Sequence, residues 1–264
     1  MSEEQKQPGR IFLGMPGYGS MTAAAARAFF YSCRDIGRPI CSYKCGSLLA
    51  ANFNMLWAQA LNMQREGVQI DYFAMLHDDM GARDYWLDTL ITELEAEQLD
   101  LLGVVAPIKD GHGLTSLALA SDNDDTWRVH CRLTMDEIHK LPETFTSHDT
   151  GRPLLLNTGC WVIRFDPAFN RRLHFTINDR IVFNETTDRY EVQVESEDWY
   201  FSRLCHEQGL RIGATRKVPV AHRGAIDYGN ELPWGDWTFD RDFLTASSLP
   251  PRASSIPAAE PALV

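Results

Sequence analysis

Short apolar runs alternate with segments of helical spacing along most of the chain. The segments at 22–31 and 49–64 have the composition or apolar spacing of helices. The strand-like runs lie at 10–15, 40–43, 72–76, 101–106 and 160–165. A chain that alternates strands with helices forms a mostly parallel sheet with its ligands at the carboxyl ends of the strands. We therefore expect an α/β fold with a Rossmann-like, mostly parallel central sheet flanked by helices.

Three local patterns extend this prediction. Thr134 and Glu137 have the spacing of a capping box, which predicts a short helix after Thr134. A strand at 192–196 is expected to lead into a helix, and a last strand is expected over 211–221.

Length and composition favour one large domain. The chain has 264 residues, of which 44% are hydrophobic, enough for a single substantial core. We expect one catalytic domain over 1–245 and a disordered tail over 246–264, which is rich in Ser, Pro and Ala. The net charge of −11 argues against bulk nucleic-acid binding, which needs a basic surface.

The cysteines and the amino terminus predict a cytoplasmic protein. The six cysteines form no CxxC pair, which argues against a structural zinc site or a disulfide framework. Residues 1–10 are polar and lack the apolar segment of a signal peptide. No apolar run reaches the roughly 20 residues that a membrane span needs.

The tripeptide His77-Asp78-Asp79 ends the apolar run at 72–76. Adjacent carboxylates at the end of a buried strand repel each other and lose hydration unless a positive charge lies beside them. Oxygen ligands suit Mg²⁺ or Mn²⁺, so the tripeptide predicts a divalent metal site. The alternative is a turn of solvated acids before Gly81, and short motifs do match by chance.

Polar residues at other element ends extend this candidate site. The loop 16–20 joins the first strand to an Ala-rich helix, as in many nucleotide-binding units. Asn52 and Asn54 lie in the first turns of a helix, where asparagine is unusual unless it has a role or faces solvent. Acids at the start of a helix, such as Glu197 and Asp198, are stabilised there by the macrodipole.

The order of these motifs resembles glycosyltransferases of the GT-A fold, of the family-two-like type. The segment 75–90 (MLHDDMGARDYWLDTL) resembles the DxD strand and the helix after it. The segment 196–212 (SEDWYFSRLCHEQGLRI) is similar to the acidic pair and helix that carry the base of the family, and 218–222 (VPVAH) resembles its closing strand. The resemblance covers roughly 10–224, and it departs from the family where His77 replaces the first DxD acid.

The resemblance implies a metal-assisted transfer of a sugar from a nucleotide-sugar donor, with a UDP-sugar as the default, to an acceptor hydroxyl. Asp79 and His222 would hold Mn²⁺ or Mg²⁺ against the diphosphate of the donor. Asp198 is the expected general base and Glu197 the second choice. If the reaction retains configuration, Asp198 would only orient the acceptor.

The layout of the family also implies the substrate contacts. Gly159 and Trp161, together with the preceding Asn157-Thr158, are expected on the acceptor side, although a strand tryptophan is more often a core residue. The expected donor contacts are Met15, Pro16, Gly17, Asn52, Asn54, His77 and Asp78.

Two other functions stay open at this point. A metal-dependent nucleotidyltransferase or phosphohydrolase would also use paired acids, with a basic phosphate clamp for which Lys109 and Arg83 are loose candidates. A non-catalytic nucleotide or carbohydrate binder would explain His77 in place of an acid. The acceptor is open among a glycan, a small molecule, a protein and a modified base.

Overall fold

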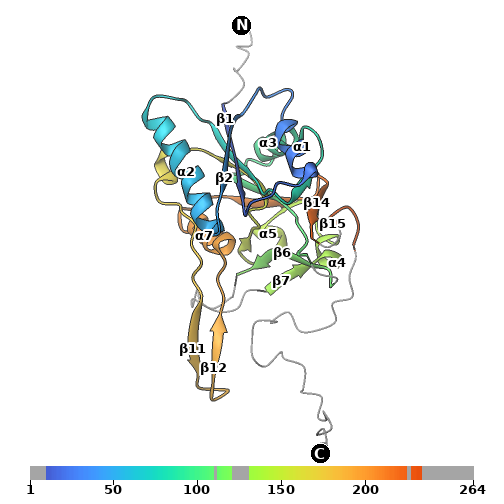
Figure 1. Cartoon of the computed structure of the whole chain (residues 1–264). Helices are drawn as coiled ribbons and strands as arrows, with labels where there is room; N and C mark the ends of the chain where they lie inside the picture. The colour runs from blue at the N-terminus through green and yellow to red at the C-terminus, as the bar shows by residue number, and fades with distance from the viewer. Residues whose placement is uncertain (1–9, 110–111, 121–130, 225–226, 234–264) are drawn as a thin grey trace, which may run out of the picture.

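A seven-stranded sheet forms the centre of the protein (Figure 1). The computed structural model describes residues 10–109, 112–120, 131–224 and 227–233. The strand order is β2-β1-β3-β10-β5-β13-β8, and only β10 and β8 run antiparallel to their neighbours. The strands are β1 (Ile11–Gly17), β2 (Ile40–Cys45), β3 (Tyr72–Leu76), β5 (Leu101–Val104), β8 (Thr144–Thr146), β10 (Cys160–Arg164) and β13 (Ile212–Thr215).

Helices cover both faces of this sheet. The helices α2 (Leu49–Arg65) and α7 (Glu197–Glu207) pack on one face, and α1 (Ala23–Phe30) and α3 (Trp86–Ala96) pack on the other. Side chains of a strand alternate between faces. In β3, Phe73 and Met75 therefore join the first core, whereas Ala74 and Leu76 join the second.

The structure confirms the expected α/β fold with a mostly parallel central sheet. The strand predicted at 72–76 is β3 with the same bounds, and the helix predicted at 49–64 is α2. The capping box also forms, because the Thr134 hydroxyl accepts from the Glu137 N–H and the Glu137 carboxylate accepts from the Thr134 N–H. These features depend on local sequence, which explains why they were predictable.

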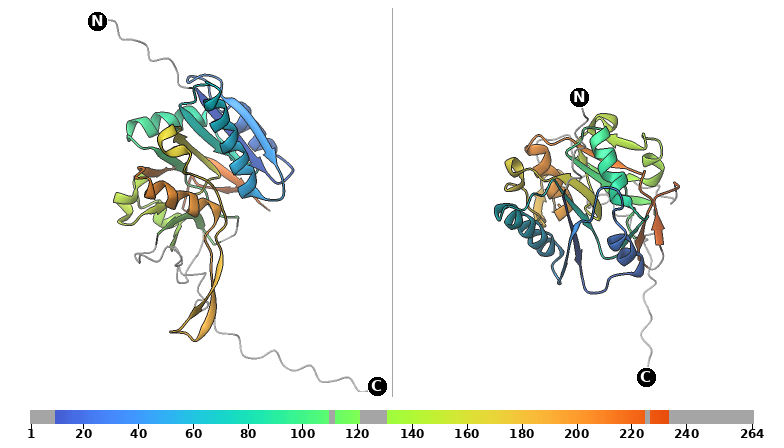
Figure 2. Two further views of the ribbon diagram at one scale, coloured as in Figure 1. Left: turned by 90° about the vertical axis from the view of Figure 1, so that its left-hand side faces the viewer. Right: turned by 90° about the horizontal axis from the view of Figure 1, so that it is seen from above.

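Two predicted strands differ from the structure. The run 211–221 divides into β13 and β14 (Val220–Arg223), because Pro219 between them has no N–H to donate to a strand ladder. The strand expected at 192–196 is instead β12 (Arg189–Gln193), which among the described strands pairs only with β11 (Arg180–Asn184). This β11–β12 hairpin projects from the body and lies outside the central sheet (Figure 2).

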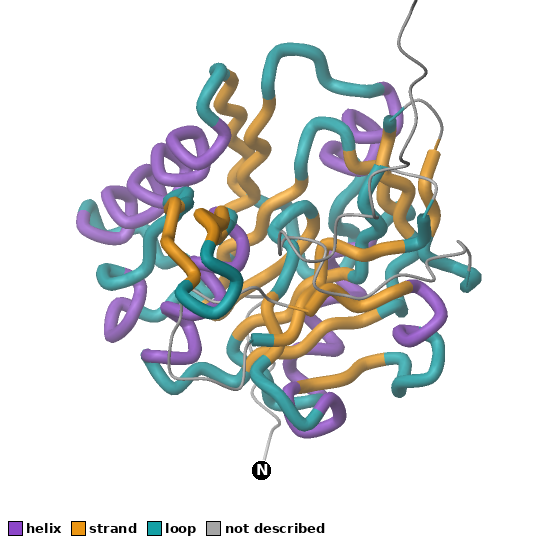
Figure 3. The backbone as a smooth tube through the Cα atoms, turned by 90° about the horizontal axis from the view of Figure 1, so that it is seen from below, coloured by secondary structure: helices purple, strands orange, loops and turns teal. Residues whose placement is uncertain are grey.

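Two small sheets and three short helices complete the described elements (Figure 3). The sheet order β15-β14-β4 joins Asp227–Gly229, β14 and Met80–Ala82. The second sheet contains β7 (Cys131–Thr134), β6 (Leu114–Leu119) and β9 (Leu154–Leu155), and the short helices are α4 (Met135–Ile138), α5 (Ser147–Thr150) and α6 (Pro167–Asn170). No helix in the described ranges has the length and apolar character needed to span a membrane. The predicted tail over 246–264 lies outside the described residues.

Candidate functional site

The tripeptide His77-Asp78-Asp79 leaves β3 at the carboxyl end of the parallel strands. Backbone hydrogen bonds fix it from several sides: the Asp78 N–H donates to Pro16, and the His77 N–H donates to Gly159. The Arg223 N–H donates to the Asp79 carbonyl at 2.8 Å, which ties the tripeptide to β14. The carboxylates therefore project from a backbone whose position is set by three strands.

The Asp79 carboxylate faces two basic side chains. Its Oδ2 atom lies 2.5 Å from the Lys109 Nζ atom and 3.5 Å from the His222 Nε2 atom. Burial alone would raise the pKa of Asp79, but the hydrogen bonds from His222 and Lys109 outweigh it and hold the pKa well below its usual range. Asp79 is thus ionised at neutral pH.

The orientation of His222 is fixed by its other ring nitrogen. The Nδ1 atom lies 2.9 Å from the Pro107 carbonyl oxygen, which only accepts, so Nδ1 carries a proton. When both ring nitrogens are protonated, the Nε2–H donates to Asp79, whereas in the neutral ring the Nε2 atom presents a lone pair toward Asp79. Two acceptors that face each other need a proton or a cation between them, and a backbone carbonyl behind a histidine is a common support for a metal ligand.

His77 lies beside this pair, and one nitrogen of its ring has no hydrogen-bond partner among the described residues. Its Nε2 atom is buried with no partner among the described residues, and the ring packs 5.1 Å from the Phe53 ring between centroids. Burial lowers the pKa of His77 to about 4, because the cost of desolvating the charged ring exceeds the stabilisation that the negative charge of Asp79 gives it. His77 is therefore neutral at pH 7.

Asp78 organises the loop that follows β1. Its buried carboxylate accepts from the Tyr18 N–H at 3.2 Å, and its carbonyl accepts from the Thr22 N–H that begins α1. Burial, followed by the negative charge of Asp79, raises the pKa of Asp78. Gly17 permits this close approach, because a Cβ atom there would lie 1.8 Å from the Asp78 Oδ2 atom.

We expect Gly17→Ala to lower the free energy of unfolding by roughly 1–3 kcal/mol, because the added methyl group must displace the Asp78 carboxylate. Thermal and urea denaturation measure this change. Gly229→Ala is the matched control, since its nearest neighbour would be 3.9 Å away. Equal loss of stability in the two variants would contradict the packing argument.

The second acidic motif begins α7. Asp198 accepts hydrogen bonds from the Thr158 hydroxyl and, at 3.3 Å, from the Asn157 side-chain amide. Burial and the charge of Glu197 raise the pKa of Asp198 to about 7, although the Thr158 hydrogen bond lowers it. Burial also raises the pKa of Glu197. A carboxylate with a pKa near neutrality is suited to accept a proton from a hydroxyl.

A chain of hydrogen bonds joins the two acidic motifs. The Gly159 carbonyl accepts from the His77 N–H, and the Gly159 N–H donates to the Asn157 Oδ1 atom at 2.8 Å. Asn157 then donates to Asp198. The segment just before β10 therefore connects the His77-Asp78-Asp79 tripeptide to Asp198 through three hydrogen bonds, by way of Gly159 and Asn157.

Tyr18 lies within electrostatic reach of both motifs. Desolvation raises the pKa of its hydroxyl, and four carboxylates raise it further. In order of effect they are Glu197, Asp79, Asp198 and Asp78. Both acidic pairs thus raise the pKa of the exposed Tyr18 hydroxyl, which lies at the carboxyl ends of the parallel strands.

The structure places several expected contacts in structural roles. Met15 is fully buried, and Trp161 is fully buried against Trp57 and Phe201 rather than open to an acceptor. Trp161 is buried because β10 is the central strand of a sheet that helices cover on both faces.

Both asparagines of α2 also form hydrogen bonds with backbone groups of other segments. The Asn52 amide donates to the Gly17 and Gly46 carbonyls, which fixes the ends of β1 and β2. Asn54 exchanges two hydrogen bonds with the backbone of Phe175. Neither side chain faces solvent alone, and both position other segments of the chain.

Sequence reasoning missed the pairing of Lys109 with Asp79 and the position of Tyr18. No local pattern links Lys109 to a residue 30 positions earlier. Tyr18 gave a weak signal, since it follows the first strand in a glycine-containing loop. The prediction placed Asn157 and Thr158 near the acceptor, but their hydrogen bonds to Asp198 are a tertiary feature.

The residues at Asp79 fit a divalent cation with two protein ligands. The lone pair of His222 and the ionised Asp79 converge, and the remaining ligands would be phosphate and water, as Mg²⁺ commonly has. Within the described ranges no three His, Cys, Asp or Glu side chains gather at metal-ligand spacing, so the protein offers no complete cage there.

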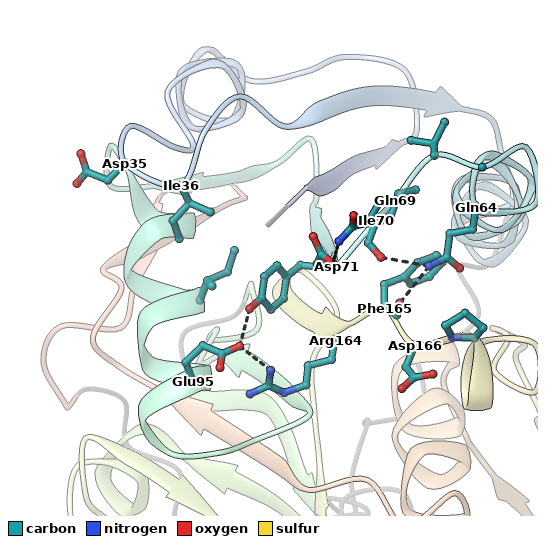
Figure 4. Close-up of a pocket in the computed structure, with 15 residues that line it drawn as sticks. Asp35, Ile36, Gln64, Gln69, Ile70, Asp71, Glu95, Arg164, Phe165 and Asp166 are labelled. Carbon is teal, nitrogen blue, oxygen red and sulfur yellow. Dashed lines mark hydrogen bonds and ion pairs between the residues drawn. The ribbon is translucent and has the colours of Figure 1, made fainter. Parts of the chain in front are cut away.

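A cavity of about 1060 Å³ lies at the amino ends of the parallel strands, opposite the acidic motifs (Figure 4). Residues before β3 and after β10 line it, and inside it Glu95 accepts from the Tyr72 hydroxyl and from Arg164, each at 2.5 Å. Ligands of parallel sheets bind at the carboxyl ends of the strands. We therefore assign the functional site to the carboxyl ends of the parallel strands, where the acidic motifs lie.

Comparison with known proteins reveals partial structural likeness. No family model matches the chain, and no curated sequence matches it. The crystal structure of A197 from STIV is similar to this one, with a TM-score of 0.48. The two sequences are 13% identical, and the match covers 81% of this chain and 86% of A197.

A nucleoside-diphosphate-sugar pyrophosphorylase and a synthetase complexed with CTP are also among the similar structures. The nucleoside-diphosphate-sugar pyrophosphorylase from Vibrio cholerae RC9 is 10% identical, with a TM-score of 0.38 over 78% of this chain and 94% of that one. A CMP:2-keto-3-deoxy-manno-octonic acid synthetase complexed with CTP is 10% identical, with a TM-score of 0.37 over 78% and 89%. TM-scores below 0.5 mark partial likeness, so function has to be inferred from the site.

Proposed function

We propose that this protein is a glycosyltransferase that moves a sugar from a nucleotide-sugar donor to an acceptor hydroxyl with the help of a divalent cation. The observation that carries the proposal is the hydrogen-bonded link from the Asp79 tripeptide to Asp198 through Gly159 and Asn157. It joins Asp79, which would hold the cation, to the Asp198 carboxylate, whose pKa is raised to about 7. A UDP-sugar is the default donor.

The donor diphosphate would lie over the tripeptide and the loop after β1. Asp79 and His222 would hold the cation, which would supply Lewis-acid stabilisation of the leaving diphosphate. The Lys109 ammonium, already 2.5 Å from Asp79, adds a second positive charge where phosphate charge develops. The neutral His77 would contact ribose or phosphate.

Asp198 would take the acceptor proton in an inverting reaction. The Thr158 hydroxyl and the Asn157 amide hold both oxygens of its carboxylate, which fixes its direction. Fixed orientation matters because a base acts only within hydrogen-bond reach of the proton. Glu197 is the second candidate for this role.

Nucleotide-dependent thermal stability tests the proposal. A ligand that binds only the folded protein raises its apparent stability. We expect one nucleoside diphosphate or sugar nucleotide to raise Tm when Mn²⁺ is present, and to raise it less without metal. No shift with any nucleotide on folded protein would refute a donor site.

Nucleotidyl transfer is the second candidate function, favoured by the basic Lys109 beside Asp79. That reaction would join a nucleoside triphosphate to a sugar phosphate and release pyrophosphate. Release of pyrophosphate from such a mixture would support this alternative. Release of nucleoside diphosphate from a sugar nucleotide would support glycosyl transfer, and nucleotide binding without turnover would indicate a non-catalytic binder.

We expect Lys109→Gln to tighten Mn²⁺ binding to the free protein roughly two- to fivefold. The ammonium competes with a cation for Asp79, and a partly exposed ion pair contributes about 0.5–1 kcal/mol. Isothermal titration with Mn²⁺ alone measures the change. Lys140→Gln is the control, since Lys140 forms its ion pair with Asp136 rather than with Asp79. Weaker Mn²⁺ binding in Lys109→Gln would contradict this competition.

A further inference from the structure

The β11–β12 hairpin carries an apolar face that nothing in the described chain covers. Its register pairs Ile181 with Val192 and Phe183 with Tyr190, so these four side chains lie on one face. They are 73%, 50%, 49% and 74% exposed, respectively. Figures 1 and 2 show the hairpin standing away from the central sheet.

The polar face of the hairpin is the less exposed of the two. Asn184 donates to both carboxylate oxygens of Glu191 at 3.0 Å, and the Thr187 hydroxyl donates to Glu191 at 2.9 Å. Antiparallel sheets normally bury the apolar face and expose the polar one. This hairpin reverses that arrangement, and a two-stranded sheet is only marginally stable by itself.

The composition of the face favours a second copy of this chain as its partner. The four side chains of the apolar face are uncharged, and the charged strand residues, two arginines and one glutamate, lie on the opposite face, whereas the whole chain has a net charge of −11. Two acidic molecules can therefore meet at this face without bringing charged strand side chains against each other. A two-fold axis would lay the Phe183–Tyr190 pair of one copy over the Ile181–Val192 pair of the other.

The area also reaches what a specific contact needs. A buried aromatic side chain removes roughly 150–250 Å² from water, so the exposed parts of these four side chains amount to about 500 Å². Two copies that covered this face completely would bury about 1,000 Å², which is the threshold for a biological interface and the size of a weak one. We propose that the apolar face of the β11–β12 hairpin is a homodimer interface.

Sedimentation velocity of the full chain tests this proposal. At an interface of this size we expect a dissociation constant on the order of 10 µM, so the mass should rise with concentration toward twice 29.9 kDa. Ile181→Ser combined with Tyr190→Ser should weaken dimerisation at least about tenfold. Far-UV circular dichroism and Tm check that the double variant is folded.

Two controls separate this face from general surface apolarity. Phe30→Ser removes an aromatic side chain that is 75% exposed on α1, and Arg189→Ser changes the polar face of the hairpin. Both should dimerise like the parent. A parent that stays monomeric at about 100 µM, or a dimer unchanged in the double variant, would overturn the proposal. These outcomes do not depend on nucleotide binding.

Discussion

Asp79→Asn is expected to lower turnover about 10²- to 10³-fold and to remove the Mn²⁺-dependent rise in Tm with nucleotide. The substitution keeps the shape of the side chain but removes the charge that Lys109 and His222 face. Loss of a group aimed at developing charge has an effect of this size. Steady-state kinetics and thermal shift with and without Mn²⁺ measure the two results.

Asp227→Asn is the matched control for Asp79→Asn. Asp227 is an exposed acid on β15, in the same small sheet as β14, and pairs with Arg223 at 3.0 Å. It should leave turnover and nucleotide binding unchanged. Mn²⁺-dependent turnover that persists in Asp79→Asn would remove Asp79 from the metal site.

Asp198→Asn is expected to lower kcat about 10²- to 10⁴-fold while donor binding is largely kept, because the amide does not accept a proton at neutral pH. In the parent, kcat/KM should rise with pH through an apparent pKa of about 7, as Asp198 becomes ionised. The variant should lose this rise. Glu197→Gln distinguishes the two candidate bases. If Glu197 is the base, Glu197→Gln should lower kcat more than Asp198→Asn does.

The same residue makes a prediction about stability that does not need an acceptor. The folded pKa of Asp198 is raised, so its contribution to stability is greatest below its ordinary pKa and is lost as pH rises through about 7. The Tm of Asp198→Asn relative to the parent should therefore increase from about pH 5 to about pH 8. A difference independent of pH would show that Asp198 titrates normally.

Local patterns were enough to predict the main elements. The strand β3 was identified because burial on both faces gives a continuous apolar run, and α2 because one buried face gives a period of 3.6 residues. Periodicity gave one strand over β13 and β14, although Pro219 before β14 is a local signal that divides the run.

The candidate site was predictable in part. Asp79 and His222 were expected to meet, and the structure places their atoms 3.5 Å apart. Asn54 and Trp161 show the limit, because a helix turn or a strand position does not tell which neighbour a side chain faces. Their roles as substrate contacts were inferred from the layout of a family rather than from packing.

By itself, the sequence determined an α/β chain with a mostly parallel sheet and with acids at the ends of its elements, because apolar periodicity and helix starts are local properties. Only the tertiary structure decided that Lys109 pairs with Asp79, that Thr158 and Asn157 hold Asp198, and that the β11–β12 hairpin stands apart. These contacts join residues distant in sequence. Their formation depends on burial and electrostatic balance across the whole fold, which no single segment encodes.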